Sequence, residues 1–376
     1  MTEIAFTGDL TFTKYLQNAW NDENLLDAEI VRFLNSADHT VVNVEGAISA
    51  GTTRTDKPLV HANPAGCVHW LKKINGNVWS LANNHSMDSG YDGFEGTMAA
   101  AKACGVQTVG IGANLEEAKR PVVIAREGGI AIIALTYFRQ NRADDATPGC
   151  LIAEDEDLVR QVIQDAKSRN RWCIVVSHVG QEFASMPMPF LRKRYLRYLS
   201  YGADIIIGHH SHVVQSYEKV GEKTIFYSLG NFVFDTDYQR IQSYTENGML
   251  IKLKFDESGY SWENMPVRLD RRELKIYPTE TPAIFTGISD FQYRLLWPLA
   301  ARQLCRNERK KYIFHKPHMA KYSWLQWLLK WEIPLCKDAD RGWDILRGRM
   351  LAMFGAWRLG NPKLIQYIKE DEDYGV

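Results

Sequence analysis

The sequence predicts an α/β fold from three features. Across the first 280 residues, short runs of β-branched and aliphatic residues alternate with longer segments of helical spacing. Two double runs, 121–137 and 216–230, each contain a central turn signal, at 127–129 and 221–222, as β-hairpins do. The sequence has neither internal repeats nor low-complexity segments. We therefore expect a mixed sheet system covered by helices.

The expected elements follow one another along the chain. Runs rich in Val, Ile and aromatic residues predict strands within the segments 4–8, 39–44, 77–82, 107–111, 121–137, 171–178, 203–208, 216–230 and 248–255. Helical spacing predicts helices within 22–36, 63–74, 90–104, 154–170 and 187–201. Asp92 is expected to cap a helix over 93–104 at its N-terminus, and Gly105 is expected to end it.

Composition and charge argue against several classes of protein. The 376 residues include 45 Lys and Arg against 45 Asp and Glu, so the formal net charge is zero and does not indicate nucleic-acid binding. The N-terminus lacks the features of a secretory signal, and no apolar run approaches the roughly 20 residues of a membrane span. The six cysteines have neither CxxC nor zinc-type spacing. We therefore expect a soluble, cytoplasmic protein with reduced thiols, and its oligomeric state stays open.

A change of composition near 265–290 predicts a domain of residues 1–280 followed by a helical extension over 281–376. The extension holds 16 Lys and Arg against 10 Asp and Glu, and its six tryptophans are Trp297, Trp324, Trp327, Trp331, Trp343 and Trp357. Three interpretations stay open for 287–376. It is a subdomain that packs its tryptophans on the first domain, a peripheral membrane contact, or a lid or docking surface for an envelope-assembly partner.

Five predicted strands each end in residue types that bind metals or transfer protons. The residues are Asp9, Glu45, the group Asn83, Asn84 and His85, then His178, and finally His209, His210 and His212. Because ligands bind at the carboxyl ends of strands in α/β sheets, these ends are expected to converge. Carboxylates, an amide oxygen and imidazoles suit Mn, Fe or Zn. Two ions sharing a bridging carboxylate would account for so many ligands, and such pairs hydrolyse phosphate esters.

Each of these residues alone has an ordinary structural explanation. An aspartate such as Asp9 after a strand is often a turn or helix cap, and a single histidine such as His178 is more often a buried hydrogen-bonding residue. In an extended segment His210 and His212 point to the same side, and His209 then faces the other way. Coincidence at five strand ends is much less expected than at one. The five together favour a metal site.

Seven sequence blocks occur in a characteristic order: TGDLTF, NVEG, SLANNHSMDSGYDGFEGT, GIGANLEEAKRPVVI, SHVGQEF, GADIIIGHHSHVVQSYE and IFYSLGNFVFD. In this order they resemble bacterial CapA-like proteins, the poly-γ-glutamate capsule biosynthesis (PGA_cap) family, which is related to the calcineurin-like metallophosphoesterases. The resemblance covers residues 2 to about 260 and leaves the tail outside. It implies a four-layer α/β/β/α metallophosphoesterase sandwich with a metal site at one edge of the two sheets.

The resemblance also implies roles for individual residues. The metal ligands that it implies are Asp9, Glu45, Asn84, His178, His210 and His212, with Glu45 bridging two ions. His85 corresponds to a general acid or phosphate-stabilising histidine, and Asp88 is expected to orient it. Thr11 stands where the wider superfamily has a metal-binding histidine, so one metal site is expected to be weaker or differently composed. Weaker candidates for the substrate pocket are Glu182, His209, Asn231 and Arg54, with Lys57 and Arg139 as further anion-binding residues.

Three functions fit this pattern. The first is a metal-dependent hydrolase, a phosphoesterase using a metal-bound hydroxide, that acts on an anionic phosphorylated or polymeric substrate in capsule or cell-envelope biosynthesis. The second is a non-hydrolytic accessory subunit of a poly-γ-glutamate-type polymer synthase, and the third is a polymer amide hydrolase. The complete set of implied ligands favours an active enzyme. The lack of an N-terminal anchor favours a cytoplasmic step, with peripheral membrane contact as the alternative.

Overall fold

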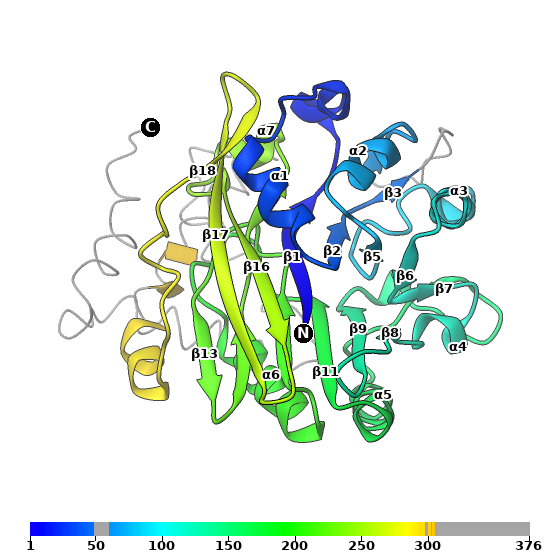
Figure 1. The fold of residues 1–376 in the computed structure, drawn as a ribbon, viewed down its shortest axis with the longest axis vertical. Coiled ribbons are helices and arrows are strands. Elements are labelled where there is room, and N and C mark those ends of the chain that lie inside the picture. Colours follow the sequence, from blue (N-terminus) through cyan, green and yellow to red (C-terminus); the bar gives the residue numbers. More distant parts are fainter. Residues whose placement is uncertain (49–59, 298–299, 302, 305–376) are drawn as a thin grey trace, which may run out of the picture.

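Two β-sheets pack face to face, and helices lie on their outer faces (Figure 1). The computed structural model describes residues 1–48, 60–297, 300–301 and 303–304 of the chain. Helices α1, α2 and α3 cover the first sheet, and α5 and α6 cover the second (Figure 1). The expected four-layer sandwich is confirmed.

The first sheet has eight strands. Its order is β18 (Lys275–Pro278), β17 (Tyr260–Asp270), β16 (Asn247–Phe255), β1 (Thr2–Leu10), β2 (His39–Val44), β5 (Val78–Ser80) and β6 (Gln107–Val109), and β15 (Asn231–Val233) also pairs with β1. Strands β1, β2, β5 and β6 are parallel to one another. Their carboxyl ends therefore lie at one edge of the sheet.

The second sheet has six strands. Its order is β13 (Tyr217–Val220), β14 (Lys223–Phe226), β12 (Ile205–Gly208), β11 (Trp172–His178), β9 (Ile130–Thr136) and β8 (Val122–Ile124). The four central strands are parallel, whereas β8–β9 and β13–β14 are antiparallel pairs. Both predicted hairpins are confirmed, and their turns contain Gly128, Gly129 and Gly221 at positive φ.

Helices and two short sheets complete the domain. The helices are α1 (Ala28–Asn35), α2 (Cys67–Lys73), α3 (Gly90–Cys104), α4 (Leu115–Ala118), α5 (Glu156–Arg169), α6 (Pro189–Tyr201) and α7 (Asp237–Arg240), with 3₁₀ turns η1 (Lys14–Leu16), η2 (Ala19–Asn21) and η3 (Arg139–Asn141). The short sheets pair β3 (Ala47–Ile48) with β4 (Ala62–Asn63) and β7 (Ile111–Gly112) with β10 (Gly149–Cys150). All five predicted helical segments contain a helix.

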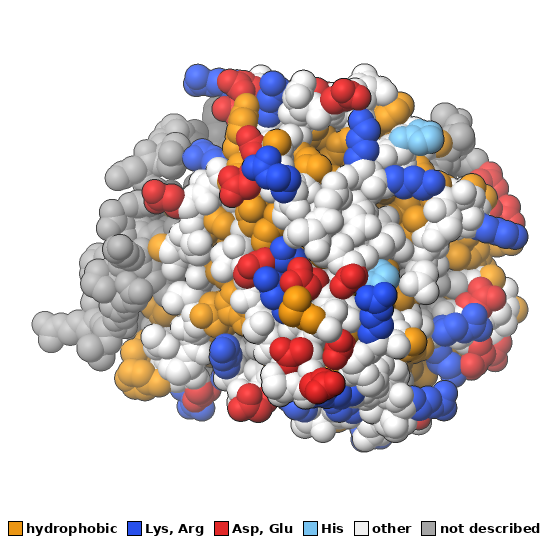
Figure 2. All heavy atoms as spheres, viewed as in Figure 1, with side chains coloured by type: hydrophobic (Ala, Val, Ile, Leu, Met, Phe, Trp, Pro, Cys, Tyr) orange, Lys and Arg blue, Asp and Glu red, His pale blue; other side chains and the backbone are white. Residues whose placement is uncertain are grey.

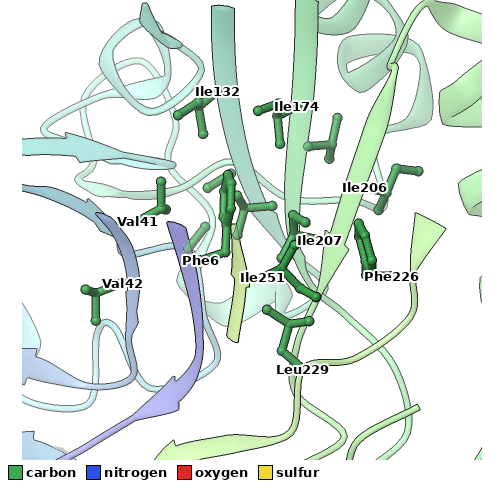
Figure 3. Packing of buried hydrophobic residues seen from close by; sticks show 14 of the residues in the cluster. Phe6, Val41, Val42, Ile132, Ile174, Ile206, Ile207, Phe226, Leu229 and Ile251 are labelled. Carbon is green, nitrogen blue, oxygen red and sulfur yellow. The ribbon is translucent and has the colours of Figure 1, made fainter. Parts of the chain in front are cut away.

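The core between the sheets is aliphatic and aromatic. Phe6, Val41 and Ile251 of the first sheet meet Ile174 and Ile207 of the second (Figure 3). All five side chains are at most 2% exposed, as expected of strands covered on both faces, whose sequences read as continuous apolar runs. Burial on this scale stabilises by roughly 25 cal/mol per Å² of apolar surface. This rigid core holds the strand ends, and hence the site, in place.

Two details differ from the sequence-based expectation. Asp92 does not cap α3, because the helix begins at Gly90 and places Asp92 within its first turn. There a carboxylate still interacts favourably with the positive end of the helix dipole. Gly105 ends the helix in a left-handed conformation with φ 67°, as predicted. Strands β17 and β18, which widen the first sheet, were not expected.

The start of the C-terminal extension packs on the sandwich. Tyr217 of β13 exchanges backbone hydrogen bonds with Thr286 and Ile288, so the chain there continues the edge of the second sheet. Residues 290–297 are helical, and Trp297 is buried, as the packed interpretation predicts. The other five tryptophans lie outside the described residues.

The visible surface carries both signs of charge. Lys, Arg, Asp and Glu side chains are interspersed over the face in Figure 2, in keeping with a formal net charge of zero. Within the described ranges, no helix combines the length and the apolar character needed to cross a membrane.

Candidate metal centre

The five predicted strand ends converge. Asp9 lies at the end of β1, Glu45 directly after β2, and Asn84 with His85 in the loop after β5, while the second sheet contributes residues from the ends of β11 and β12. Contacts of 4 Å or less join residues of both sheets. All the implied ligands are buried.

Asp9 contacts three histidines that follow β12 of the second sheet. Its Oδ1 lies 2.8 Å from Asn43 Nδ2 and 3.0 Å from His209 Nδ1. Its Oδ2 accepts the backbone N–H of His210 at 3.2 Å and lies 3.2 Å from His212 Nδ1. Burial opposes ionisation, but the hydrogen bonds from the two imidazoles outweigh it and hold the pKa of Asp9 well below its usual value. Asp9 is therefore held as a carboxylate.

Glu45 has the opposite environment. Both of its carboxylate oxygens are buried, and neither has a hydrogen-bond partner among the described residues. Oε1 lies 3.8, 3.9 and 4.0 Å from the Nε2 atoms of His85, His178 and His212. Burial raises the pKa of Glu45 well above its usual value.

This arrangement fits a bound divalent ion. A buried carboxylate without hydrogen-bond donors destabilises the fold, because it has lost its hydrogen bonds to water and has no others in their place. Metal–ligand bonds of about 2.0–2.2 Å place two ligand atoms of one ion roughly 3–4 Å apart. The separations between Glu45 Oε1 and the three imidazole nitrogens match that spacing.

Asn43 joins the two sheets and is not among the predicted site residues. Its Nδ2 donates to Asp9 Oδ1 and lies 3.1 Å from His178 Nδ1, while the other ring nitrogen of His178, Nε2, lies 2.8 Å from Asn84 Oδ1. Asn43 stands two residues before Glu45, and alternate residues of a strand share a face. That spacing was a usable signal.

His85 and Asp88 form the expected pair. His85 Nδ1 lies 2.5 Å from Asp88 Oδ2, which leaves Nε2 facing Glu45. His61, which is not among the predicted site residues, donates its backbone N–H to the same Asp88 oxygen at 3.1 Å. The His61 ring is buried with its centroid 4.1 Å from that of His85, and burial lowers the pKa of His61 well below its usual value. No motif marks His61 in the sequence.

The histidine-rich turn after β12 is not extended, so that expectation was wrong. His210 and His212 have φ of 80° and 58°, in the left-handed region that non-glycine residues rarely adopt. The turn directs His212 Nδ1 toward Asp9 and Asn231 Oδ1, and it places the His210 ring 4.9 Å from that of His178. His209 does not face away, because the same turn brings its Nδ1 to Asp9.

The weaker candidates have different surroundings. Asn231 contacts His212 through Oδ1 and donates from Nδ2 to Gln239 and to the Thr245 carbonyl, so it holds His212. Glu182 is half-buried on the loop after β11, and its charge adds, after burial and Asp9, to the causes that raise the pKa of Glu45. Arg54 and Lys57 lie outside the described residues. Arg139 is ion-paired with Glu154.

The model of the bacterial capsule synthesis protein family PGA_cap matches residues 3–236. The chain belongs to this family. Among curated relatives, the PGA biosynthesis protein CapA of Bacillus subtilis is 29% identical over 68% of this chain and 68% of its own. The capsule biosynthesis protein CapA of Bacillus anthracis is 28% identical over 68% of this chain and 64% of its own. A probable polyglutamine synthesis accessory protein of Mycobacterium tuberculosis is 29% identical over 64% of this chain and 68% of its own. This PGA_cap chain thus spans about two thirds of these relatives' lengths.

Solved structures show more distant likeness. A hypothetical protein from Thermus thermophilus aligns with a TM-score of 0.43 at 11% identity, over 74% of this PGA_cap chain and 100% of that chain. A 5'-nucleotidase from Candida albicans aligns with a TM-score of 0.42 at 12% identity, over 73% of this chain and 53% of that chain. Both scores are below 0.5, so neither likeness bears on function.

Proposed function

We propose that this PGA_cap protein is a metal-dependent hydrolase, a phosphoesterase that acts in the biosynthesis of a bacterial capsule or cell-envelope polymer. The observation that carries the proposal is Glu45. It is a fully buried carboxylate without hydrogen-bond donors among the described residues, and three imidazole nitrogens face it at 3.8–4.0 Å. Such a carboxylate destabilises the fold unless it binds a cation, so its position is best explained by a role as a metal ligand.

One ion would be held by Asp9, Glu45 and His212, whose ligand atoms all lie within 4.8 Å of one another. The resemblance places Asn84, His178 and His210 around a second ion that would share Glu45, and of these three His178 has Nε2 3.9 Å from Glu45 Oε1. The mixture of carboxylate, amide and imidazole donors suits Mn, Fe or Zn. Bound ions of this kind supply a Lewis acid and make water a nucleophile near neutral pH.

The protein's own residues orient the side chains of the centre. Asn43 and His209 fix the Asp9 carboxylate, and Asn231 fixes His212. Asp88 fixes His85, so that its Nε2 faces the centre from the side of the first sheet. His85 is therefore placed to act on the leaving group of an anionic substrate.

Hydrolysis assays with metal-stripped protein test this proposal. The substrates would be p-nitrophenyl phosphate and bis(p-nitrophenyl) phosphate, with Mn²⁺, Fe²⁺ or Zn²⁺ added back. We expect hydrolysis to appear on metal addition and to be lost in His210→Ala, which removes an imidazole beside His178. Metal analysis of both proteins accompanies the assay. Bound metal without hydrolysis of either ester would contradict a phosphoesterase.

A second function has one specific observation in its favour. A relative from Mycobacterium tuberculosis is named as a polyglutamine synthesis accessory protein. An accessory subunit would keep the metal centre for binding an anionic polymer without cleaving it. This function would be favoured if poly-γ-glutamate co-elutes with the metal-loaded protein in gel filtration. The polymer should keep its length, and the protein should lack esterase activity.

A further inference from the structure

A second group of potential ligands lies beside the first. In the described part of the chain, Glu45, His61 and His85 each offer one ligand atom, and these atoms lie within 4.8 Å of one another. His61 comes from the segment that leads into β4, far in sequence from the strand ends. Its side chain packs against His85 and against Phe234, at ring-centroid distances of 4.1 and 5.3 Å. The sequence blocks that identify the family assign it no role.

Polar atoms of this group are buried without hydrogen-bond partners. This holds, within the described residues, for both carboxylate oxygens of Glu45 and for Nδ1 of His61, whose side chain is 3% exposed. An unpaired buried polar atom costs about 1–3 kcal/mol, so native proteins rarely leave two such groups side by side. A cation between the carboxylate and the imidazoles would satisfy them together.

His85 is oriented as metal-binding histidines are. Its Nδ1 is hydrogen-bonded to Asp88 Oδ2 at 2.5 Å, and its Nε2 faces Glu45 Oε1 at 3.8 Å. A carboxylate on one ring nitrogen commonly fixes the ring while the other nitrogen binds the metal. The same Asp88 oxygen accepts the backbone N–H of His61 at 3.1 Å. One carboxylate therefore holds both histidines of the group.

We propose that Glu45, His61 and His85 form a second divalent-cation position, which shares Glu45 with the position at Asp9 and His212. This rests on the proposed metal centre and identifies a ligand of its second ion. Two imidazoles and one carboxylate with an open coordination position form a donor set used by catalytic zinc sites. His85 Nε2 would then bind the ion, and this role replaces the one at the leaving group that the proposed function gives to His85.

The proposal departs from the ligand set that the resemblance implies. That set places Asn84, His178 and His210 around the second ion. Among the described His, Cys, Asp and Glu residues, the groups whose ligand atoms lie within 4.8 Å of one another are Glu45 with His61 and His85, and Asp9 with Glu45 and His212. His178 Nε2 is instead hydrogen-bonded to Asn84 Oδ1 at 2.8 Å. His61 supplies an imidazole that this set lacks.

Metal stoichiometry tests the proposal without reference to activity. Full-length wild type, His61→Ala and His61→Phe would be stripped of metal and titrated with Mn²⁺ by calorimetry, with metal content measured by mass spectrometry. The phenylalanine variant keeps an aromatic ring against Phe234 but has no ring nitrogen. His69→Ala is the matched control, because His69 is exposed on α2. Co²⁺ titration followed by visible absorption reports each position spectroscopically.

We expect wild type and His69→Ala to bind two equivalents of Mn²⁺ per chain, and both His61 variants to bind one. In the Co²⁺ titration, the absorption increase from the second equivalent should be absent in the His61 variants. Unchanged stoichiometry in a folded His61→Phe protein would overturn the proposal, as would a wild type that binds a single ion. Failure of the proposed function would give a different set of results. In that case wild type binds two ions and His61→Phe one, but neither hydrolyses phosphate esters.

Discussion

Glu45 is the residue that most needs a partner that the described side chains do not supply. Burial raises its pKa, and the imidazole nitrogens of His85, His178 and His212 lie 3.8–4.0 Å from its Oε1, beyond hydrogen-bond distance. Ionised Glu45 therefore destabilises the metal-free fold, and a bound cation reverses that effect.

Glu45→Gln should separate metal binding from folding. The neutral amide imitates the protonated carboxyl, so we expect the unfolding temperature of the metal-free protein at neutral pH to be maintained or raised. Mn²⁺ at 100 times its dissociation constant should stabilise wild type by about 2.7 kcal/mol and leave the variant unchanged. Scanning calorimetry with and without Mn²⁺ measures both. Glu257→Gln, at an exposed position, is the control, and a wild-type metal response in Glu45→Gln would contradict the account.

Asp88→Asn tests the orientation of His85. The neutral amide oxygen accepts the His85 Nδ1–H and the His61 backbone N–H more weakly than the charged carboxylate does. Loss of such a supporting carboxylate typically costs 10–100-fold in metal affinity or activity. We expect a loss in that range for Mn²⁺ affinity measured by calorimetry. Asp145→Asn, exposed in a loop, should bind Mn²⁺ as wild type does, and equal affinity in Asp88→Asn would show that the pair has no such role.

The sequence predicts the residues at strand ends better than those between them. Asp9, Glu45 and His178 could be placed together because parallel strands present their carboxyl ends at one edge. His61 could not, since it lies 24 residues before its neighbour His85 in an irregular segment. The left-handed turn at His210 also escaped prediction, because nothing local to a non-glycine residue marks that conformation.

At the level of elements, β16 and β17 are joined by an ion pair between buried Lys252 and partly exposed Glu263. Lys252 Nζ lies 2.7 Å from Glu263 Oε1 and donates to Ser36 Oγ at 2.8 Å, and its side chain is 6% exposed. The hydrogen bond from Lys252 lowers the pKa of Glu263. Glu263 therefore stabilises the fold above its usual pKa of about 4.3, and this contribution is lost as the pH falls through the lowered value.

Glu263→Gln should lower stability at neutral pH and flatten its acid dependence. Because Glu263 is about half exposed, solvent screens the pair, and we expect a loss of about 1 kcal/mol. Urea unfolding at pH 7 and at pH 3 measures it. The difference between variant and wild type should be present at pH 7 and smaller at pH 3. An equal difference at both pH values would show that the charge is not the cause, and Glu222→Gln, in an exposed turn, is the control.

Element prediction succeeded where the apolar pattern was continuous. Parallel strands such as β11 and β12 are covered on both faces and read as apolar runs. Strand β17 was missed because its sequence mixes polar residues with Pro266, and most of its positions are only half-buried. The start of α3 was misplaced by three residues, since Ser89 begins the helix without a side-chain cap.

At the scale of the whole molecule, residues on the C-terminal side of the expected boundary at 280 pack on the sandwich. Buried residues continue past 280 through Ile284, Phe285, Tyr293 and Leu304. Removal of residues 305–376 should therefore leave the sandwich folded, with an unfolding temperature within about 4 °C of full length. A chain ending at 285 should lose considerably more, because it exposes core side chains. Equal stability of the two truncated chains would contradict this boundary.

The chain ending at 304 also tests the membrane interpretation of the tail. If 287–376 contacts membranes through its distal tryptophans and basic residues, full-length protein should float with anionic vesicles and the shortened chain should not. Equal partitioning of both would end that interpretation. The outcome leaves the metal centre unaffected, since every described residue of the centre precedes 304.

The central claim is that the ends of five strands build a metal centre around Glu45. Anomalous diffraction from a crystal soaked in Mn²⁺ tests it most directly. We predict an anomalous peak about 2.0–2.2 Å from a Glu45 oxygen and at a similar distance from His212. A map without a peak beside Glu45, in a crystal whose Mn²⁺ binds elsewhere on the protein, would contradict the account.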